Sequence, residues 1–397
     1  MRIFIIEPDG AGGLLHYAFQ MSAAIAESGQ EVTLVTGRHY ELEGVDAPFR
    51  VEPRMRLWPA VEPPDSRHLP APLRKLRRMW RGLRYAVEWH RLTRYLLRER
   101  PDLIQFSTIR FPIQALFLRR LHNAGLRLSQ VCHEFEPREA RIDWLRRISM
   151  RMTNTAYRAF DVIFVHGDGH RDRFRELFDT TADLVVIPHG DEGLLSQLAD
   201  GGGDLRRSYG LDADRPVVLF FGGLRPSKGI PDLLKAFAVA LEQVPDAALV
   251  IAGYPAAGFD VEALHRLAAG ADIEASVSID ARYLPLSEVG PLVRTGAVVA
   301  LPYLSGTASG VLQAAYTFGR PVIVTDVGSL AEAVEDGVTG LVVPPGDTVA
   351  LAAALSKMLA DPDQAAGMGR AAGRASRERF GWEAIATRVM DAYGGPS

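Results

Sequence analysis

A short apolar strand that runs into a turn of small residues constrains the fold of this chain most. Residues 296–302 are apolar, residues 306–310 are small, and residues 311–318 are apolar again. This order predicts a buried parallel strand, a tight turn and then a helix. Because the first amides of a helix have no partner inside it, we expect an anion such as a phosphate to bind at this turn. Ser309 is expected to cap the helix, and Gly310 to let the ligand approach the backbone.

The alternation of strand and helix continues along most of the sequence and predicts an α/β fold. Expected strands lie at residues 2–6, 31–36, 103–107, 128–132, 161–166, 184–188, 217–222, 247–253, 276–280, 321–325 and 341–344. Expected helices lie at residues 14–28, 230–244, 261–268, 287–295, 330–335 and 380–393. With 397 residues the chain is too long for one compact core. We therefore expect two Rossmann-like, doubly wound domains that face a central cleft, residues 1–190 and 191–378, followed by a last helix in residues 379–397.

Composition and charge exclude several classes of protein. The chain is 47% hydrophobic and 23% charged, and no run of apolar residues is long enough to predict a membrane-spanning helix. The apolar part of the N-terminal stretch is too short for a signal peptide, so a strand is expected there. Cys132 is the single cysteine, which excludes an internal disulfide and is typical of a reducing cytoplasm. A net charge of -3 argues against binding to nucleic acid.

A glycine-rich turn follows the first expected strand. Gly12 and Gly13 stand where the turn of a βαβ unit lets the phosphate or sugar of a ligand approach the backbone. The glycines lack the G-x-G-x-x-G spacing with a well-placed acidic residue, so they do not favour a dinucleotide. Residues 44–72, rich in Pro, Arg and Glu, are expected to form a loop or an insertion.

Residues 74–100 predict a basic amphipathic helix or a pair of helices. Ten Lys or Arg residues stand against two glutamates, and two apolar stripes recur at helical spacing. The first stripe is Leu76, Trp80, Leu83 and Val87, and the second is Tyr85, Trp89, Leu92 and Leu96. One interpretation is contact with an anionic membrane surface, to which each cation near the lipid adds about 1 kcal/mol. In the alternative, both stripes pack on the domain core and the arginines are merely solvated.

Two cations stand in the turn that follows the expected strand 217–222. Arg225 can grip two oxygen atoms of a diphosphate and Lys228 adds a point charge, so together they can neutralise it without a metal. In the alternative, they are surface residues that open an ordinary helix. Neither a DxD-like pair nor a His/Cys cluster has the spacing of metal ligands, so we expect no metal and no cofactor.

Several motifs together resemble the retaining family-4 glycosyltransferases of the GT-B fold. They are the Gly12-Gly13 turn, IPHGD at 187–191, G-x-x-R-P-S-K-G at 222–229, ARYLPLSEVGPLV at 281–293, ALPYLSGTASGV at 300–311 and FGRPVIVTDVGSLAEAVEDGVTGLVVPPGD at 318–347. The resemblance extends from residue 2 to residue 393. It implies a UDP- or GDP-sugar donor held mainly by the C-terminal domain and an acceptor held mainly by the N-terminal domain. The last helix would cross back to the N-terminal domain.

The resemblance also implies roles for individual residues. Arg225 and Lys228 would bind the donor diphosphate and assist catalysis. Arg282, Tyr283 and Leu284 would line the nucleobase. Further donor contacts would come from Gly12, Gly13, Gly222, Thr307, Ser309, Gly310 and Val311.

The resemblance also places His133, in the stretch VCHEFEP, near the transferred sugar as a catalytic residue. By its position alone, a histidine at the end of a strand can equally be a cap or a core residue. Glu134, Glu136 and Arg138 are candidates for acceptor contacts, although an exposed loop would have the same composition.

The chain departs from the family pattern at the phosphate turn. Many relatives carry two glutamates eight residues apart, at positions that align here with Gly306 and Ala314. A subset with an S-x-T-x-S-G-V turn lacks them too, and we assign the chain to that subset, with Gln313 as a candidate replacement. The common arginine near Gly223 is also absent, and Arg225 is expected to take its place.

These expectations define a metal-independent sugar transfer by front-face substitution with retention, in which cations and a helix N-terminus stabilise the departing diphosphate. Three readings differ in the acceptor or in the presence of catalysis. The first is transfer to a lipid-linked glycan precursor in polysaccharide or glycolipid synthesis, by a cytoplasmic protein on the inner face of the plasma membrane. The second is transfer to a soluble acceptor, such as a natural product or a sugar. The third is a non-catalytic GT-B binding subunit, and a GT-B epimerase is a fourth.

Overall fold

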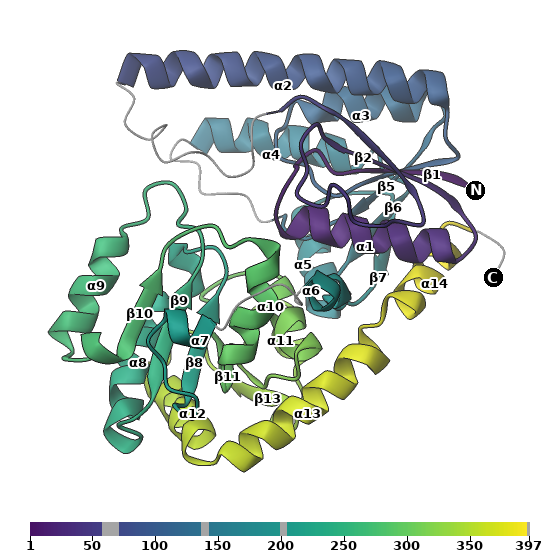
Figure 1. Ribbon diagram of the computed structural model, residues 1–397. Helices are drawn as coiled ribbons and strands as arrows, with labels where there is room; N and C mark the ends of the chain where they lie inside the picture. The colour runs from purple at the N-terminus through teal and green to yellow at the C-terminus, as the bar shows by residue number, and fades with distance from the viewer. Residues whose placement is uncertain (58–70, 136–142, 199–204, 395–397) are drawn as a thin grey trace. The chain divides into compact units, whose positions relative to one another are not determined.

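The computed structural model describes residues 1–57, 71–135, 143–198 and 205–394. The chain divides into two compact units, Met1–Ile187 with Trp382–Ser397, and Pro188–Gly381. The boundaries expected from the sequence lie after residues 190 and 378. Each unit is built around its own parallel sheet (Figure 1).

The first unit contains a sheet with the strand order β3-β2-β1-β4-β5-β6-β7. Its strands are β1 (Arg2–Ile6), β2 (Glu31–Gly37), β3 (Arg50–Met55), β4 (Leu103–Phe106), β5 (Arg127–Val131), β6 (Val162–Val165) and β7 (Asp183–Val186). The chain first adds strands on one side of β1 and then, from β4 onward, on the other. This is the doubly wound order, and it confirms the predicted fold class for this unit.

Helices cover both faces of this sheet. They are α1 (Gly13–Glu27), α2 (Ala71–Glu99), α3 (Gln114–Asn123), α4 (Asp143–Tyr157), α5 (Asp168–Leu177) and α14 (Trp382–Ala392). Figure 1 shows α2 and α3 on the face of the sheet opposite α1. Because both faces are covered, residues 3–6 of β1 are all buried, although their side chains alternate between the faces.

The last helix is anchored in the first unit by a buried tyrosine. Tyr393 Oη donates to Gln105 Oε1 at 2.6 Å and lies 2.8 Å from Ser129 Oγ. Arg127 Nη1 donates to the carbonyl of Tyr393 at 2.9 Å. These contacts join a segment at the end of the sequence to β4 and β5.

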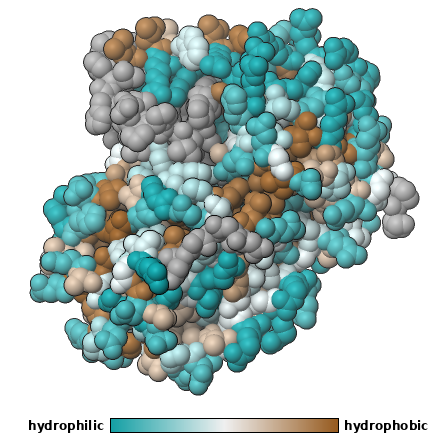
Figure 2. All heavy atoms as spheres, viewed as in Figure 1, coloured by the Kyte–Doolittle hydropathy of each residue, from teal (hydrophilic) through white to brown (hydrophobic). Residues whose placement is uncertain are grey.

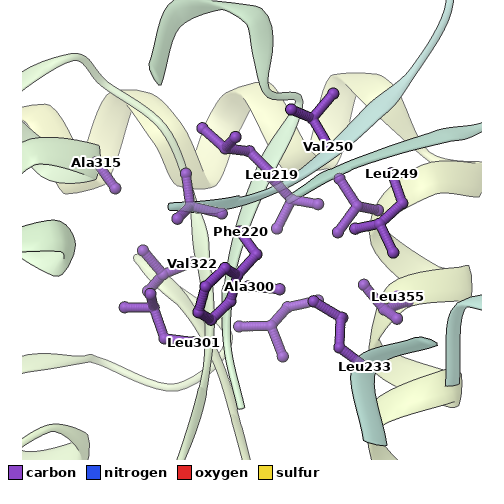
Figure 3. Packing of buried hydrophobic residues seen from close by; sticks show 14 of the residues in the cluster. Leu219, Phe220, Leu233, Leu249, Val250, Ala300, Leu301, Ala315, Val322 and Leu355 are labelled. Atoms are coloured by element: carbon purple, nitrogen blue, oxygen red, sulfur yellow. The ribbon is translucent and has the colours of Figure 1, made fainter. Parts of the chain in front are cut away.

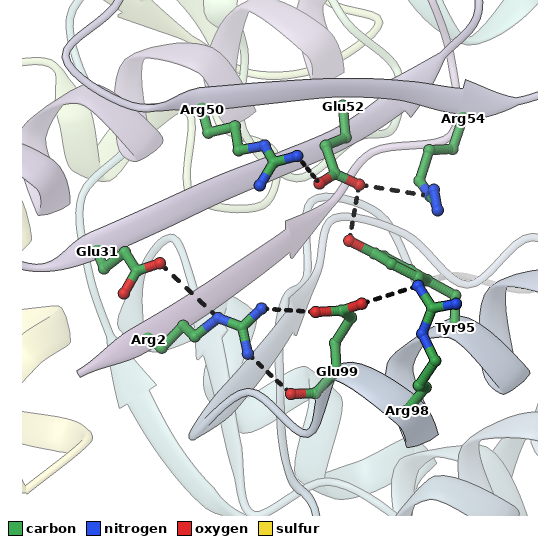
Figure 4. Close-up of polar contacts among 8 residues, drawn as sticks. All are labelled: Arg2, Glu31, Arg50, Glu52, Arg54, Tyr95, Arg98 and Glu99. Atoms are coloured by element: carbon green, nitrogen blue, oxygen red, sulfur yellow. Dashed lines mark hydrogen bonds and ion pairs between the residues drawn. The ribbon is translucent and has the colours of Figure 1, made fainter.

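Strand β3 lies within residues 44–72, for which a loop or an insertion is expected, and the loop is wrong for residues 50–55. The strand is rich in Arg, Glu and Pro because it forms the edge of the sheet, where polar side chains are accommodated. Figure 4 shows how its charged residues pair. Glu52 accepts from Tyr95 Oη of α2 at 2.7 Å, and Arg2 of β1 donates to Glu99 at 2.8 Å, so the end of α2 is fixed against the sheet.

The two apolar stripes of α2 have different environments. Tyr85, Trp89, Leu92 and Leu96 are buried in the core of the first unit. Leu76, Trp80, Leu83 and Val87 are exposed, by 62%, 55%, 66% and 40%. Figure 2, in the same view as Figure 1, shows hydrophobic residues among hydrophilic ones along the edge that α2 forms. The alternative interpretation, in which both stripes pack on the core, is therefore wrong for the first stripe.

The second unit repeats the doubly wound order, as β10-β9-β8-β11-β12-β13. Its strands are β8 (Val217–Phe221), β9 (Ala248–Ala252), β10 (Val277–Asp280), β11 (Val298–Leu301), β12 (Val322–Thr325) and β13 (Gly340–Val343). Its α-helices are α6 (Gly193–Leu198), α7 (Leu205–Ser208), α8 (Ile230–Gln243), α9 (Val261–Gly270), α10 (Leu286–Thr295), α11 (Gly310–Thr317), α12 (Thr348–Ala360) and α13 (Pro362–Arg379). Its 3-10 helices are Pro226–Lys228, Glu274–Ser276 and Ala331–Ala333. The helix predicted at residues 330–335 is therefore a single 3-10 turn.

The core of the second unit lies between its sheet and helices on both faces. Figure 3 shows Leu233 of α8 and Leu355 of α12 beside side chains of the central strands, among them Phe220 and Leu301. All four side chains are fully buried. Burial of this kind stabilises a core by about 25 cal/mol for each Å² of apolar surface removed from water. The rigid sheet fixes where each strand ends, and therefore where the turns that follow it lie.

Candidate active site

The candidate donor site lies at the carboxyl edge of the second sheet. The parallel register of β8, β11 and β12 places the turns that follow them at one edge. These turns hold residues 222–229, 302–309 and 326–329. In doubly wound sheets ligands bind at this edge, outside the carboxyl ends of the strands.

The turn with the two cations is fixed directly on the end of β11. The amide of Leu304 donates to the carbonyl of Ser227 at 2.8 Å. A Cβ atom on Gly229 would lie 1.9 Å from the carbonyl oxygen of Pro302, so only glycine allows this approach. The structure therefore brings the turn of Arg225 and Lys228 next to the strand that leads to the expected phosphate turn.

Lys228 is linked to the phosphate turn through an aromatic ring. Its Nζ lies 3.3 Å from the centroid of the Tyr303 ring, a cation–π contact. The hydroxyl of Tyr303 lies 3.1 Å from Ser309 Oγ. Arg225 is exposed and makes no ion pair with the described residues. A ligand at this edge would meet both cations.

Ser309 occupies the N-cap position of α11, as predicted, but its side chain does not cap the helix. The hydroxyl of Ser309 pairs with the hydroxyl of Tyr303 instead, so it accepts from none of the amides at the start of α11. The amides of Leu312 and Gln313 bond to the carbonyl of Ser309, whereas those of Gly310 and Val311 have no backbone partner among the described residues. Fewer amides are therefore available for a ligand than at a helix whose first four amides all lack a partner. The two that remain, those of Gly310 and Val311, lie at the helix N-terminus, where an anion is favoured.

Gly310 makes room for the side chains of the protein itself. A Cβ atom at this position would lie 3.0 Å from Glu192 Oε1 and 3.6 Å from His189 Cε1. Both residues belong to the segment IPHGDEG, whose first five residues entered the sequence analysis only as a motif of the family. The structure thus places a carboxylate and an imidazole at the start of α11, although neither was predicted as a site residue.

Of the two side chains near Gly310, Glu192 is buried and His189 is half-buried, and the partial burial of His189 determines the protonation state of its imidazole. Burial lowers the pKa of His189 to about 4, against the opposing effect of its hydrogen bond with the carbonyl of Gly190 at 3.1 Å. His189 is therefore neutral at pH 7. Since the carbonyl can only accept, Nδ1 of His189 carries the proton and Nε2 is an acceptor. The amide of Glu192 donates to Thr317 Oγ1 at 3.0 Å and fixes its loop on α11.

The turn after β12 braces the phosphate turn. The amide and the hydroxyl of Ser329 both donate to the carbonyl of Thr307 at 3.0 Å. On the other side, the Cβ position of Gly222 lies 3.3 Å from Val311 Cγ2. The predicted donor-binding residues Gly222, Thr307, Ser309, Gly310 and Val311 are thus brought together at one edge, with Arg225 and Lys228.

The positions of the two missing glutamates differ in burial. Gly306 is exposed, whereas Ala314 is 1% exposed within the core of the second unit. A charged carboxylate at position 314 would be costly without a partner. Gln313, the candidate replacement, is also buried, and its Oε1 has no hydrogen-bond partner among the described residues.

The predicted base-lining residues follow the carboxyl end of β10, at the same edge. Arg282 donates to Glu288 and pairs with Asp280, with Nε to Oδ1 at 3.0 Å, and its pKa is raised mainly by Glu288 and further by Asp280. Leu284 is 5% exposed and belongs to the core. Tyr283 is half-buried. Contact of these residues with a nucleobase stays a prediction, although the burial of Leu284 leaves its backbone as the group that could make it.

In the first unit, the glycine turn before α1 is filled by a side chain of the protein. The amide of Gly12 donates to Glu41 Oε1 at 2.6 Å, and the same carboxylate pairs with His16. A carboxylate at a helix N-terminus is stabilised there. In this structure the amide of Gly12 is therefore engaged, and donor binding by Gly12 and Gly13 stays a prediction.

His133 follows β5 and is half-buried. Its Nδ1 lies 2.9 Å from Nε2 of His166, which follows the neighbouring strand β6. The ring of Tyr17 packs edge-on against His133 at 4.5 Å. His166 is absent from the predicted site residues, although a histidine directly after an expected buried strand lies at the same sheet edge as His133.

The predicted acceptor contacts follow His133 along the chain. Glu134 is exposed, as expected for such a contact. Glu136 and Arg138 lie outside the described residues. Among the residues that the structure describes, no group of three or more His, Cys, Asp or Glu side chains could hold a metal ion. Within the same residues, no helix has both the length and the apolar character needed to cross a membrane.

Comparisons with known proteins agree with this fold. A glycosyl transferase 4-like domain model matches residues 12–190, and a glycosyl transferases group 1 model matches residues 215–361. The chain is 32% identical over 242 residues to the GDP-mannose-dependent alpha-(1-6)-phosphatidylinositol monomannoside mannosyltransferase of Mycolicibacterium smegmatis. This match covers 57% of the chain and 60% of the relative, so the chain spans less than two thirds of that protein.

Solved structures resemble the chain over nearly its whole length. The sucrose-phosphate synthase of Thermosynechococcus elongatus has a TM-score of 0.74 at 22% identity, with 99% of this chain and 98% of that chain covered. Anabaena HepE in complex with UDP-glucose has a TM-score of 0.72 at 19% identity, with 99% of each chain covered. These likenesses show the fold, and the two family models, one in each half of the sequence, show the family. The chain therefore belongs to the family-4 glycosyltransferases of the GT-B fold.

Proposed function

We propose that the chain is a retaining glycosyltransferase that moves a sugar from a nucleotide-sugar donor to a hydroxyl group of a lipid-linked glycan precursor. One observation carries the proposal: the turn of Arg225 and Lys228 adjoins the N-terminus of α11, through the Tyr303–Ser309 contact. Two cations and two amides without backbone partners then converge on one edge of the sheet. This arrangement suits a diphosphate leaving group.

The comparisons support a nucleotide-sugar donor. The mycolicibacterial relative is GDP-mannose-dependent by name, and the Anabaena neighbour was solved with UDP-glucose. The two differ in base and in sugar, so the proposal commits to the class of donor. The nucleobase would lie beside Tyr283 and the backbone of Leu284, at the same edge as the cations.

In the proposed reaction, the acceptor hydroxyl oxygen forms a bond to C1 of the sugar on the face that the diphosphate leaves. The bond between C1 and the diphosphate oxygen breaks, and its electron pair leaves with the diphosphate. Arg225, Lys228 and the start of α11 stabilise this developing charge. The hydroxyl proton passes to an oxygen of the departing phosphate, so the step requires neither a protein nucleophile nor a metal.

Glu192 is the proposed replacement for the missing glutamates. The structure places its carboxylate 3.0 Å from the Cβ position of Gly310, at the start of the helix that would hold the phosphate. A carboxylate next to a bound diphosphate repels it but accepts hydrogen bonds from sugar hydroxyls. We therefore assign Glu192 to the donor hydroxyl groups.

The exposed stripe of α2 supports a lipid-linked acceptor. The stripe carries Trp80 and three aliphatic residues, and Arg84 lies over the Trp80 ring at 5.1 Å. Tryptophan and arginine on one face of a helix suit the interface of an anionic membrane. The protein would then act on the inner face of the plasma membrane, where a lipid-linked precursor is presented.

The Lys228→Ala variant tests the donor site. The expected loss of transfer from a nucleotide sugar is about 100-fold or more, because a charge aimed at the leaving group is removed. UDP-, GDP- and dTDP-sugars are first screened by thermal shift to select the donor. Lys235→Ala, on the exposed side of α8, is the matched control and should keep full activity.

Transfer by Lys228→Ala at the wild-type rate would overturn the assignment. Absence of both transfer and donor hydrolysis in the wild type would favour a non-catalytic binding subunit.

A further inference from the structure

A pocket in the second unit lies at the end of the sheet opposite the donor turns. It has a volume of about 400 Å³, and its lining includes Pro216, Ala297 and Pro321. These residues directly precede β8, β11 and β12. Because the three strands are parallel, the pocket lies at their amino edge, whereas the candidate donor site lies at their carboxyl edge. The two sites are therefore separate.

Two arginines make this pocket positively charged. Arg320 and Arg370 both line it, and none of its lining residues is acidic. Phe318, Met358 and Leu359 supply apolar surface beside the guanidinium groups. A concave surface that combines apolar residues with a few convergent polar groups is typical of a site for a small molecule.

Only part of the Arg320 side chain makes contacts that stabilise the fold. Its Nη2 donates at 2.6 Å to the carbonyl of Arg294, in the last turn of α10, where a cation stabilises the helix end. Its Nε, however, is buried and has no hydrogen-bond partner among the described residues. A buried donor without a partner is costly, so an acceptor in the pocket would stabilise it.

The surroundings of Arg320 disfavour its charge. Burial lowers its pKa, and the nearby positive charges of Arg206 and Arg294 lower it further. Arg370 is exposed and makes neither a hydrogen bond nor an ion pair with the described residues. An anion beside Arg320 would offset the repulsion from Arg206 and Arg294.

Close packing of backbone holds the two arginines at one place. A Cβ atom on Gly369 of α13 would lie 2.3 Å from the carbonyl oxygen of Gly319 and 3.1 Å from Pro321 Cδ. Helix α13 therefore lies directly on the loop that carries Arg320, with Arg370 next to the contact. The backbone positions of Arg320 and Arg370 are therefore set by rigid elements.

We propose that this pocket binds the phosphate group of a small phosphorylated molecule between Arg320 and Arg370. A phosphate dianion matches two guanidinium groups in charge, and each guanidinium can grip two of its oxygen atoms. A single carboxylate would leave one positive charge without compensation. The apolar wall of Phe318, Met358 and Leu359 leaves room for the body of the molecule. Such a site would bind a regulator or a second ligand of the protein, away from the donor.

Thermal unfolding and calorimetric titration of the full chain with inorganic phosphate test the proposal. Sodium chloride at equal ionic strength controls for screening, and acetate tests for any oxyanion. The wild type is expected to show a rise in Tm that saturates with phosphate, as mass action requires. Arg370→Gln, which changes an exposed side chain, should keep the Tm without phosphate and weaken phosphate binding at least tenfold. Lys228→Ala should keep the phosphate response, because its lysine lies in the donor turn.

Three results would overturn the proposal. The first is a wild type without a saturable response to phosphate. The second is a response that Lys228→Ala abolishes and Arg370→Gln keeps, which would place phosphate in the donor site. The third is an equal response to phosphate, acetate and chloride, which would mean general screening. Arg320→Lys, which keeps the charge but removes Nε as a donor, should weaken phosphate binding without removing it.

Discussion

Nδ1 of His133 lies 2.9 Å from Nε2 of His166, and Nδ1 of His166 lies 3.4 Å from the carbonyl oxygen of Ile187. A carbonyl oxygen can only accept, so Nδ1 of neutral His166 carries the proton and its Nε2 accepts a hydrogen bond. Nδ1 of His133 must then donate to it. The contact with His166 therefore keeps the proton of neutral His133 on Nδ1. Its lone pair is then on Nε2, where it can accept a hydrogen bond from a hydroxyl group.

Replacement of His166 by phenylalanine should impair transfer through His133. Phenylalanine keeps a ring at this position but cannot accept from Nδ1, so the tautomer and orientation of His133 are no longer fixed. We expect kcat/KM to fall, its pH profile to change, and the double variant with His133→Ala to be less than additive by about 0.5–3 kcal/mol. His122→Phe, on an exposed position of α3, is the control. Strictly additive losses with an unchanged pH profile would show that His166 does not act through His133.

A methyl group at position 310 should disturb the start of α11. In Gly310→Ala the new Cβ would lie 3.0 Å from Glu192 Oε1, so the carboxylate or the helix must shift. We expect a loss of stability of about 1–3 kcal/mol, typical of overpacking, together with weaker binding of the nucleotide sugar. Gly270→Ala, whose Cβ meets nothing within 4 Å, is the matched control in thermal unfolding and donor titration. Donor affinity equal to that of the control variant would refute the role of this contact.

Glu7 should make stability depend on pH. It follows β1 and is fully buried, and burial, with a smaller contribution from Asp9, raises its pKa from 4.5 to about 8. Between these values the folded state keeps a proton that the unfolded state has lost, so the stability from Glu7 is lost as pH rises toward 8. The slope is at most about 1.4 kcal/mol for each pH unit.

Glu7→Gln should remove this slope, because glutamine does not titrate. Urea unfolding of both proteins from pH 5 to pH 9 measures the difference between their free energies of unfolding. Other titrating groups contribute equally to both proteins, so their contributions cancel from this difference. The free energy of unfolding of the variant should rise relative to that of the wild type as pH rises, and this difference should level off above pH 8. Glu31→Gln changes a carboxylate whose side chain is 74% exposed, and serves as the control. A difference that is constant over this range would contradict the raised pKa.

The exposed stripe of α2 should be required for membrane binding. Flotation with liposomes that contain anionic phosphatidylglycerol is expected for the wild type, and weaker flotation with neutral phosphatidylcholine. Trp80→Glu and Leu83→Glu should each reduce flotation, because a carboxylate would be placed in the interface. Leu267→Glu, on an exposed position of α9, is the matched control. If the α2 variants float like the control, the reading with a soluble acceptor is favoured.

The predicted fold agrees with the structure wherever an apolar run is long enough to identify a strand. The central strands of both sheets lie within a few residues of their predicted bounds, because a strand covered on both faces is apolar throughout. Edge strands lack this signal. Strand β3, with Arg50, Glu52, Pro53 and Arg54, has the composition of a loop because one of its edges has no neighbour in the sheet.

The candidate site was predictable in its backbone and less so in its side chains. The turn of Arg225 and the turn of Thr307 follow neighbouring strands, so their proximity follows from topology. The contact of Glu192 with Gly310 could not be inferred, because it depends on how the segment after Pro188 packs on α11. The capping role of Ser309 failed for a similar reason, since a competing hydroxyl from Tyr303 lies within reach.

The anchoring of α14 by Tyr393 has a consequence for biosynthesis. The first unit includes residues from both ends of the described sequence, with the whole of Pro188–Gly381 inserted between them. During translation the N-terminal portion leaves the ribosome early, but its partner for Gln105 and Ser129 is made only after the inserted unit. Maturation of the first unit therefore has to wait for the second, and a nascent chain arrested before residue 382 would expose the surface that α14 covers to chaperones.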